Sequence, residues 1–398
     1  MNTVPAPPPP AAQFHRYDLL IIPLLILATL VGLVAFGEFC SRQIFVESGS
    51  ETCLMKGPAG VNMMRPNCTS YRKAAEGPPT INAYNDCGYR TPQPCGTRLP
   101  GEIRVALMGT STAAGMKVPY ADTFAAKLTA TLTKACDRPV DFQNMGIPGA
   151  SMADVYRRTG EALAMHPELV MLVITPIEMR GSEDEGGGGH VAPAAGAASP
   201  GAAAPPQSVR TRVKSLVSWI SDLAYRSRLL VAAQHYLFED RATYIKLYML
   251  HGDDADYLRL PYSPAWQERL DAFDKMLGDM AARTKAAGVP MMLVLAPARI
   301  QAALLDPALR PAGVDPFALG RYLAAIAERH GVIYQDALDQ FAAVHRPDLM
   351  FYAVDGHVDG AGHTLIADAI FDRLLHARDP FTNCTGAHLA QSQTAATP

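Results

Sequence analysis

Five short strand candidates, separated by segments with helical spacing, constrain the fold of this chain more than any other feature. The strand candidates cover residues 105–108, 140–143, 169–174, 290–296 and 332–334, and the helical segments cover residues 123–132, 151–165, 263–287, 315–330 and 362–377. A run that is apolar at every position, such as 169–174, is typical of a strand buried on both faces. Strands that alternate with helices favour a mainly parallel sheet. The pattern therefore predicts an α/β fold, a three-layer sandwich in which helices flank a mainly parallel sheet.

The first 36 residues differ in composition from the rest of the chain. Residues 1–18 are rich in Pro and Ala, which is typical of a disordered tail. Residues 19–36 contain Thr29 as their only polar residue, and a spanning helix needs roughly 17–25 such residues. A cleaved signal peptide is the alternative, but its apolar core is shorter, roughly 7–15 residues, and Ala35-Phe36-Gly37 matches the expected cleavage site poorly. We therefore predict an uncleaved transmembrane helix that anchors the chain in a membrane.

The cysteines indicate on which side of the membrane the main part of the chain lies, because the flanking Arg16 and Arg42 are too evenly balanced to decide it. Of the 7 cysteines, Cys40 lies at the membrane edge, and residues 37–102, rich in Pro, Gly and Asn, also contain Cys53, Cys68, Cys87 and Cys95. A segment with so little apolar periodicity gains from disulfides, which persist in oxidising compartments, and the spacing is not that of a zinc site. We predict disulfides among these last four, with their connectivity open. Residues 37–398 are then extracytoplasmic, in a periplasmic or extracellular space.

Composition also divides the remainder of the chain. We predict a cysteine-rich neck at 37–102, a main domain at 103–378 and a C-terminal tail at 379–398. Residues 182–208 are rich in Gly, Ala and Pro, which predicts a flexible low-complexity insertion in the main domain. Residues 209–262 are helical and rich in aromatic side chains, and we favour a cover for the sheet over a lid or pocket wall. A net charge of −3 without a Lys/Arg-rich run argues against a nucleic-acid partner.

Ser111 lies on a tight turn between the first strand of the main domain and the helix that follows. Gly109 ends the apolar run, and residues 123–132 then show helical spacing. The turn is therefore at the carboxyl end of a strand, where ligands bind in open α/β sheets. A hydroxyl held there can act as a nucleophile if a base reaches it. The alternative is a turn in which Ser111 only caps the helix.

A second polar loop, residues 354–363, leads into the last helix. His357 in this loop can act as a general base, and Asp355 can orient its imidazole. His363 is a competitor, but it falls in the first turn of the helix, where it packs or faces solvent. The two histidines and two aspartates of the loop have no standard metal-binding spacing. We therefore predict no metal and no cofactor.

Residues 104–378 resemble the SGNH/GDSL hydrolase family in several separated blocks. Residues 104–128, RVALMGTSTAAGMKVPYADTFAAKL, are similar to the first block, in which a Gly-Asp-Ser turn presents the nucleophile. Ser111 takes the nucleophile position, and Thr110 replaces the Asp. Residues 142–156, FQNMGIPGASMADVY, are similar to the second block. The family's oxyanion glycine in that block corresponds to Gly149, with Gly146 close by.

The last block is also matched, whereas the third departs from the family. Asp355 and His357 resemble the family's Asp-x-His, and Gly362-His363 continues its Gly-His helix start. In the third block, LVMLVITPIEM at 169–179, the Asn that usually completes the oxyanion hole is replaced by Ile177, followed by Glu178. Loss of one oxyanion donor typically costs roughly 10²–10³ in kcat. Three explanations stay open: the N–H groups of Ser111 and Gly149 suffice, Thr175 or Asn144 contributes, or the site has lost catalysis.

The resemblance implies both a fold and an activity. The implied fold is the flavodoxin-like SGNH hydrolase fold, and the implied catalytic residues are Ser111, His357 and Asp355. With the predicted anchor, the expected protein is a membrane-anchored extracytoplasmic serine esterase or O-acyltransferase. Its substrate would be an acylated carbohydrate or another small ester. The alternative is a non-catalytic SGNH-like protein that binds carbohydrate or takes part in polysaccharide assembly.

Overall fold

A computed structural model describes residues 17–57, 60–180, 227–250, 252–376, 380, 381 and 384. The chain divides into two compact units, one made of Met1–Phe45 with Pro206–Ala233 and the other of Val46–Pro205 with Gln234–Pro398. The predicted insertion at 182–208 lies outside the described residues, as do nearly all of the tails predicted at 1–18 and 379–398.

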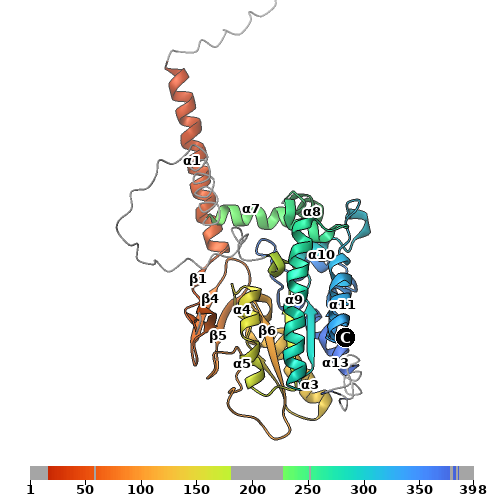
Figure 1. The fold of residues 1–398 in the computed structure, drawn as a ribbon. Coiled ribbons are helices and arrows are strands. Elements are labelled where there is room, and N and C mark those ends of the chain that lie inside the picture. The colour runs from red at the N-terminus through yellow and green to blue at the C-terminus, as the bar shows by residue number, and fades with distance from the viewer. Residues whose placement is uncertain are drawn as a thin grey trace, which may run out of the picture. The chain divides into compact units, whose positions relative to one another are not determined.

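The main described element of the first unit is helix α1, Asp18–Ile44. This helix, labelled in Figure 1, is long and apolar enough to cross a membrane. Its large apolar side chains are exposed. The helix continues beyond the predicted residue 36 into a polar stretch, where Glu38 and Arg42 form an i,i+4 ion pair at 2.8 Å. Within the same unit, the Glu38 carboxylate accepts hydrogen bonds from the backbone N–H groups of Arg228 and Leu229 at 3.1 and 2.9 Å.

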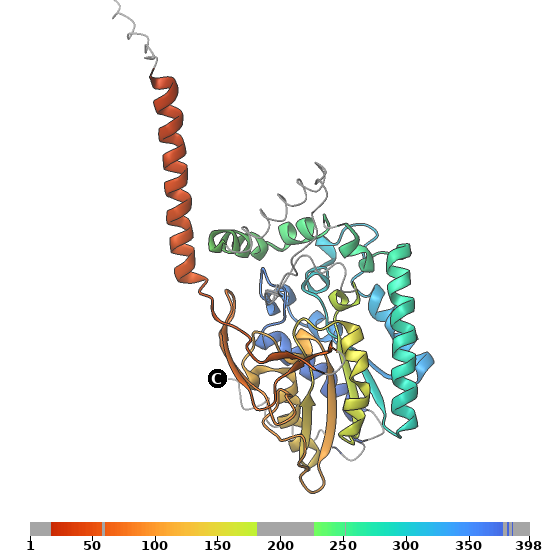
Figure 2. The same cartoon turned by 60° about the vertical axis from the view of Figure 1, so that its left-hand side comes forward.

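The second unit is built on a five-stranded sheet (Figures 1 and 2). Its strands are β6 (Ile103–Gly109), β7 (Val140–Asn144), β8 (Leu169–Ile174), β9 (Met291–Leu295) and β10 (Ile333–Asp336). They pair in the order β10-β9-β8-β6-β7, and every pair is parallel. Counted along the chain, this is the flavodoxin-like order. The predicted fold class is therefore confirmed, and β8 has the bounds that its apolar run predicted.

Helices cover both faces of this sheet. One face carries α3 (Phe124–Cys136), α12 (Leu338–Ala342) and α13 (Gly360–Leu375), and the other carries α4 (Met152–Arg157), α5 (Thr159–Ala164), α9 (Pro264–Ala286) and α11 (Ala318–His330). The helix predicted at 151–165 is thus two short helices that meet at Arg158. The other described helical elements of the chain are α2 (Ser111–Ala114), η2 (Tyr120–Asp122), η3 (Pro176–Arg180), α7 (Arg228–Glu239), α8 (Arg241–Tyr248), η4 (Gly252–Leu258), α10 (Arg299–Ala303), η5 (Pro307–Leu309) and η6 (Pro347–Met350).

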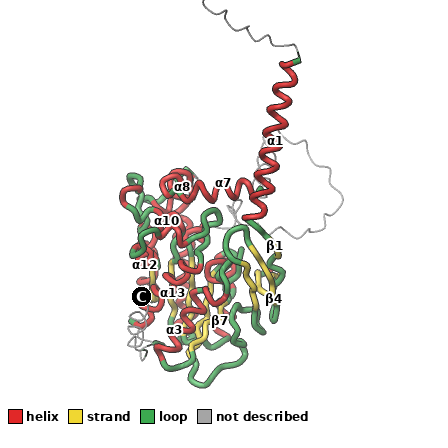
Figure 3. Tube along the Cα trace, turned by 180° about the vertical axis from the view of Figure 1, so that it is seen from behind, coloured by secondary structure: helices red, strands yellow, loops and turns green. Residues whose placement is uncertain are grey.

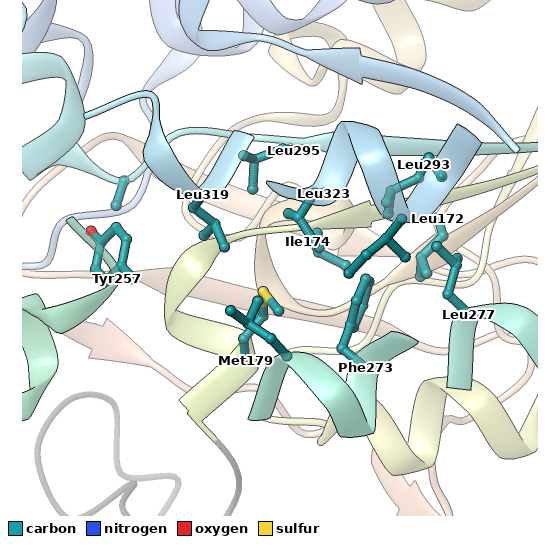
Figure 4. Close-up of a cluster of buried hydrophobic side chains, with 14 of the residues drawn as sticks. Leu172, Ile174, Met179, Tyr257, Phe273, Leu277, Leu293, Leu295, Leu319 and Leu323 are labelled. Carbon is teal, nitrogen blue, oxygen red and sulfur yellow. The ribbon is translucent and has the colours of Figure 1, made fainter. Parts of the chain in front are cut away.

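The core consists of two layers because successive strand residues point to opposite faces of the sheet. Along β8, Leu169, Met171 and Val173 join the layer under α3 and α13, while Val170, Leu172 and Ile174 join the layer under α9 and α11. Figure 4 shows the second layer, in which side chains of β8 and β9 meet Phe273 and Leu277 of α9 and Leu319 and Leu323 of α11.

The described part of residues 209–262 also contributes to the second layer. Tyr244, Ile245, Tyr257 and Leu258 are buried in it. This packing supports the interpretation that the described part of residues 209–262 covers the sheet, rather than the alternative that it forms a lid.

Residues 46–102, which we call the N-terminal β segment, belong to the second unit, and Figure 3 shows two of their strands, β1 and β4. They form β1 (Ser48–Gly49), β2 (Leu54–Lys56), β3 (Asn62–Met64), β4 (Thr69–Lys73) and β5 (Pro79–Ala83), in two antiparallel sheets. Cys53, Met64 and Tyr84 pack with Ile147 and Ala150 from the loop after β7. The segment predicted as a neck therefore shares its small core with the α/β domain.

Six of the seven cysteines pair as three disulfides. Cys53 is bonded to Cys68, and Cys87 to Cys95, so the four cysteines singled out in the sequence pair with one another. The third disulfide joins Cys136 at the end of α3 to Cys384, and Cys40 is a free thiol.

Candidate active site

The turn that carries Ser111 is held tightly against the sheet. Ser111 is the first residue of α2, directly after β6. Gly109 has a φ of +151°, and a Cβ there would lie 2.5 Å from the carbonyl oxygen of Val173. A Cβ on Gly146 would lie 2.4 Å from the backbone nitrogen of Ala114. Only glycine fits at these two positions, because β8 and the loop after β7 approach the backbone of the turn so closely.

Ser111, His357 and Asp355 form one chain of hydrogen bonds. His357 Nε2 lies 2.8 Å from Ser111 Oγ, and His357 Nδ1 lies 2.6 Å from Asp355 Oδ1. A carboxylate only accepts, so Nδ1 carries the proton it donates to Asp355, and Nε2 is left to accept from the Ser111 hydroxyl. The loop between η6 and α13 supplies both residues at the carboxyl edge of the sheet. The structure brings together the three residues that the sequence singled out, in the geometry of a nucleophile, a base and an orienting acid.

Lys117 is a fourth member of the site that the sequence reasoning missed. Its ammonium forms an ion pair with Asp355 Oδ2, and its side chain is 10% exposed. Tyr352 Oη donates to the carbonyl oxygen of Lys117 at 3.0 Å. Burial alone would raise the pKa of Asp355, but the attraction of His357 and Lys117 outweighs burial and holds this pKa well below its usual range. Asp355 therefore stays ionised at neutral pH.

His363 lies apart from this chain of hydrogen bonds. Its ring is buried, stacks on Phe124 at a centroid distance of 5.5 Å, and accepts at Nδ1 from the Phe124 backbone N–H at 3.3 Å. Burial, followed by repulsion from Arg90 and His357, lowers the pKa of His363 to about 3. The ring is thus a neutral packing group, which is one of the two roles, packing or facing solvent, expected from its place in the first turn of the helix.

The residues considered for the oxyanion hole differ in their surroundings. Gly149 has a φ of +71°, and a Cβ there would meet nothing within 4 Å, so the chain at this point borders open space. Ile177 lies in η3 with its side chain 46% exposed and offers no hydrogen-bond donor. Asn144 is buried and braces the nucleophile turn: Nδ2 donates to Ala113 at 2.8 Å, and Oδ1 accepts from Gly146 at 3.0 Å. These bonds assign Asn144 to the scaffold of the turn.

Glu178 connects the third block to the nucleophile turn. Its Oε1 accepts a hydrogen bond from Thr110 Oγ1, and its Oε2 accepts one from the Thr175 backbone N–H at 2.9 Å. Thr110 stands where the family has Asp, so Thr110 and Glu178 together tie the end of β8 to the turn that carries Ser111.

One group of side chains in the described ranges has the proximity of a metal site. Asp86, Cys87 and Cys95 place their ligand atoms within 4.8 Å of one another. Cys87 and Cys95 are joined in a disulfide, which leaves them no thiolate to coordinate a metal.

Comparisons with known proteins found similar solved structures. No family model matches the sequence, and no curated protein matches it. A catalytic mutant of Axe2, an acetylxylan esterase from Geobacillus stearothermophilus, is 16% identical, with 68% of this chain and 93% of that chain covered and a TM-score of 0.36. The acetyl xylan esterase AlAXEase is 14% identical, with 68% and 98% covered and a TM-score of 0.36. A putative lipolytic protein from Desulfitobacterium hafniense DCB-2 is 10% identical, with 68% and 98% covered and a TM-score of 0.34. Its description names it as a protein of the G-D-S-L family.

Proposed function

We propose that this chain is a serine ester hydrolase of the SGNH/GDSL type that acts through an acyl-enzyme on Ser111. The observation that carries the proposal is the hydrogen-bond chain from Ser111 through His357 to Asp355, at the carboxyl edge of a parallel sheet. A serine hydroxyl has a pKa far above neutral and needs such a base to become a nucleophile.

The proposed reaction has two halves. In the first, Ser111 Oγ attacks the ester carbonyl carbon while His357 Nε2 takes the hydroxyl proton, and the alcohol leaves with that proton. In the second, water or a sugar hydroxyl loses its proton to His357 and attacks the acyl carbon, the bond from this carbon to Ser111 Oγ breaks, and His357 returns the proton to Oγ. Water as acceptor gives an esterase, and a sugar hydroxyl gives an O-acyltransferase. The backbone N–H groups of Ser111 and Gly149 are the oxyanion donors in this scheme.

The substrate class that we propose is an acylated carbohydrate or another small ester, with no cofactor. The length and composition of α1 support a membrane anchor. The disulfides of the N-terminal β segment support an extracytoplasmic location for the domain that carries the site. Ile177, which offers no donor where the family has Asn, is the observation that keeps a non-catalytic carbohydrate-binding role as the second candidate.

A fluorophosphonate probe tests the proposal, because it bonds covalently to an activated serine. The full chain in detergent is expected to be labelled at Ser111, and peptide mapping by mass spectrometry would locate the label. Ser111→Ala is expected to remain unlabelled. The wild type should also hydrolyse an acetyl ester of a small phenol or an O-acetylated sugar. Absence of labelling together with absence of turnover on both esters would contradict the esterase proposal and support the non-catalytic carbohydrate-binding role.

Lys117 gives the proposal a second test. Its ammonium pairs with Asp355 Oδ2 and, with His357, holds the pKa of Asp355 well below its usual range. In Lys117→Met the carboxylate loses this partner and is held less firmly against the imidazole, so kcat is expected to fall by roughly 3- to 10-fold. The control is Lys127→Met, since the Lys127 ammonium lies 4.0 Å from Asp122 and outside the catalytic chain. A wild-type kcat in Lys117→Met would show that this ion pair does not position Asp355.

A further inference from the structure

Two buried charged side chains of the N-terminal β segment reach the loops that carry the proposed catalytic residues. Arg90 is 2% exposed and Glu76 is 6% exposed. Both precede the stretch that resembles the SGNH/GDSL family, residues 104–378. Arg90 contacts main-chain atoms of α2 and of the loop after it, and Glu76 contacts the loop that carries Asp355.

Arg90 holds the nucleophile turn from its C-terminal side. Its Nη1 donates to the carbonyl oxygens of Ala114 and Gly115 at 2.7 and 2.6 Å, and its Nη2 donates to that of Val118 at 2.8 Å. Because α2 is a single turn that begins at Ser111, these carbonyls lie at its end and just beyond it. One guanidinium therefore fixes the end of the turn that starts with the nucleophile.

Glu76 holds the loop of the acid and the base. Its carboxylate accepts from the backbone N–H of Val354 at 3.0 Å and from that of Asp355 at 2.9 Å. The same carboxylate contacts His235 Nδ1 at 2.7 Å. The adjacent Gly77 has a φ of +86°, and a Cβ there would lie 2.8 Å from the ring of Tyr352. The backbone of the N-terminal β segment is thus packed directly against the start of this loop.

Both side chains come from constrained stretches of backbone. Arg90 lies between Cys87 and Cys95, which are joined by a disulfide. Glu76 lies in the connection between β4 and β5, which pair in antiparallel register from Lys73↔Pro79 onward. The two side chains thus come from one segment and reach the two loops that carry Ser111 and His357, which are 246 residues apart in the sequence.

We propose that Arg90 and Glu76 are positioning residues that hold the nucleophile turn and the Asp355–His357 loop at reacting distance, so that the N-terminal β segment is part of the catalytic unit. The proposal rests on the proposed esterase function. Its physical basis is that a misplacement of about 1 Å in a catalytic group can cost roughly 10²-fold in rate. Neither side chain contacts the reacting atoms in this scheme.

The principal test compares Glu76→Gln with Glu102→Gln in the full chain in detergent. Glu102 is a matched control: it is a buried carboxylate of the same segment that accepts from the Leu99 backbone N–H at 2.9 Å and from Arg104 Nε at 3.0 Å, directly before β6 and at the opposite end of this strand from Ser111. Glu76→Gln is expected to lower kcat on a phenyl acetate by roughly 10- to 100-fold while KM changes less than about twofold. Glu102→Gln is expected to keep the wild-type kcat even where it lowers the melting temperature.

Arg90→Lys is the companion variant, with Arg104→Lys as its control. Arg104 is also buried, but it donates to the carbonyl oxygens of Cys95 and Thr97 near the start of β6, at the opposite end of the strand from Ser111. A single ammonium cannot reproduce the fork that binds three carbonyls. We therefore expect a kcat loss of roughly 10-fold in Arg90→Lys and wild-type kcat in Arg104→Lys.

Hydrogen exchange gives a readout that does not depend on turnover. In Glu76→Gln, the amides of a peptide spanning residues 352–358 are expected to exchange faster, since Val354 and Asp355 lose their charged acceptor. In Glu102→Gln this peptide should exchange as in the wild type. A wild type that is neither labelled nor active would contradict the proposed function, and unchanged exchange in Glu76→Gln would contradict the positioning proposal. Wild-type kcat in folded Glu76→Gln and Arg90→Lys, or an equal loss of kcat in Glu102→Gln, would also overturn the positioning proposal.

Discussion

Ser111→Ala is expected to lower kcat by roughly 10⁴- to 10⁶-fold on an acetyl ester of a small phenol, and His357→Ala by a similar factor. Without the Oγ atom no acyl-enzyme forms, and without the imidazole 2.8 Å away nothing takes the serine proton. The two residues act as one unit, so the double variant should be little worse than either single variant.

Asp355→Asn is expected to have a kcat between those of the wild type and Ser111→Ala. It keeps the shape of the side chain but removes the charge that orients His357 and pairs with Lys117. The loss in kcat is expected to be large but about 10- to 100-fold smaller than for Ser111→Ala, because the base and the nucleophile are still present. Burst-phase release of the phenol would show whether the acyl-enzyme step is the one that slows.

His363→Ala is the control that separates the two histidines. The stacking of His363 on Phe124 and its hydrogen bond to the Phe124 N–H contribute to packing. This variant should lower the melting temperature while kcat stays within a few-fold of the wild type. Wild-type turnover in Ser111→Ala on both test esters would contradict the catalytic assignment, and a kcat in His363→Ala as low as in His357→Ala would contradict the separation of roles.

The parts of the fold that could be predicted from the sequence are those that depend on patterns among neighbouring residues. The apolar run at 169–174 gives β8 its bounds because each of its residues is buried on one face or the other. The meeting of Ser111 with His357 followed from topology, since the carboxyl ends of parallel strands share one edge of the sheet. The break at Arg158 between α4 and α5 was not predicted, because helical spacing continues through it.

What could not be predicted are contacts between residues far apart in the chain without a local signal. Lys117 has a φ of +67° and pairs with Asp355, 238 residues away, and no spacing rule connects the two. Glu76 lies in a loop of the segment predicted as a neck, and its partners are backbone N–H groups, which carry no sequence information. Thr110 stands where the resembled family has Asp, and Glu178 follows Ile177, which stands where that family has Asn. The hydrogen bond between Thr110 and Glu178 is visible only in the folded chain.

Ile177→Asn is expected to raise kcat by roughly 10- to 100-fold, since one oxyanion donor is typically worth roughly 10²–10³ in kcat and a newly placed amide will be less well aligned than an evolved one. The side chain of Ile177 is 46% exposed, so its replacement costs little buried apolar surface, and the fold should tolerate it. Both carboxylate oxygens of the neighbouring Glu178 already accept hydrogen bonds from Thr110 and the Thr175 N–H, which keeps η3 in place around the new side chain. Because the donor acts on charge that develops in the transition state, kcat should rise while KM stays nearly constant.

Two controls decide how the Ile177→Asn result is interpreted. Ile177→Leu keeps an apolar side chain without a donor and should match the wild type, so that a gain in the Asn variant belongs to the amide. Ile177→Asp has nearly the shape of Asn but places a carboxylate where negative charge develops, and it should be slower than the wild type. Equal kcat values for the Asn and Leu variants would contradict the prediction and would mean that the N–H groups of Ser111 and Gly149 already complete the hole. A slower Asn variant would instead assign to Ile177 an apolar contact with the substrate, which the family's Asn could not make.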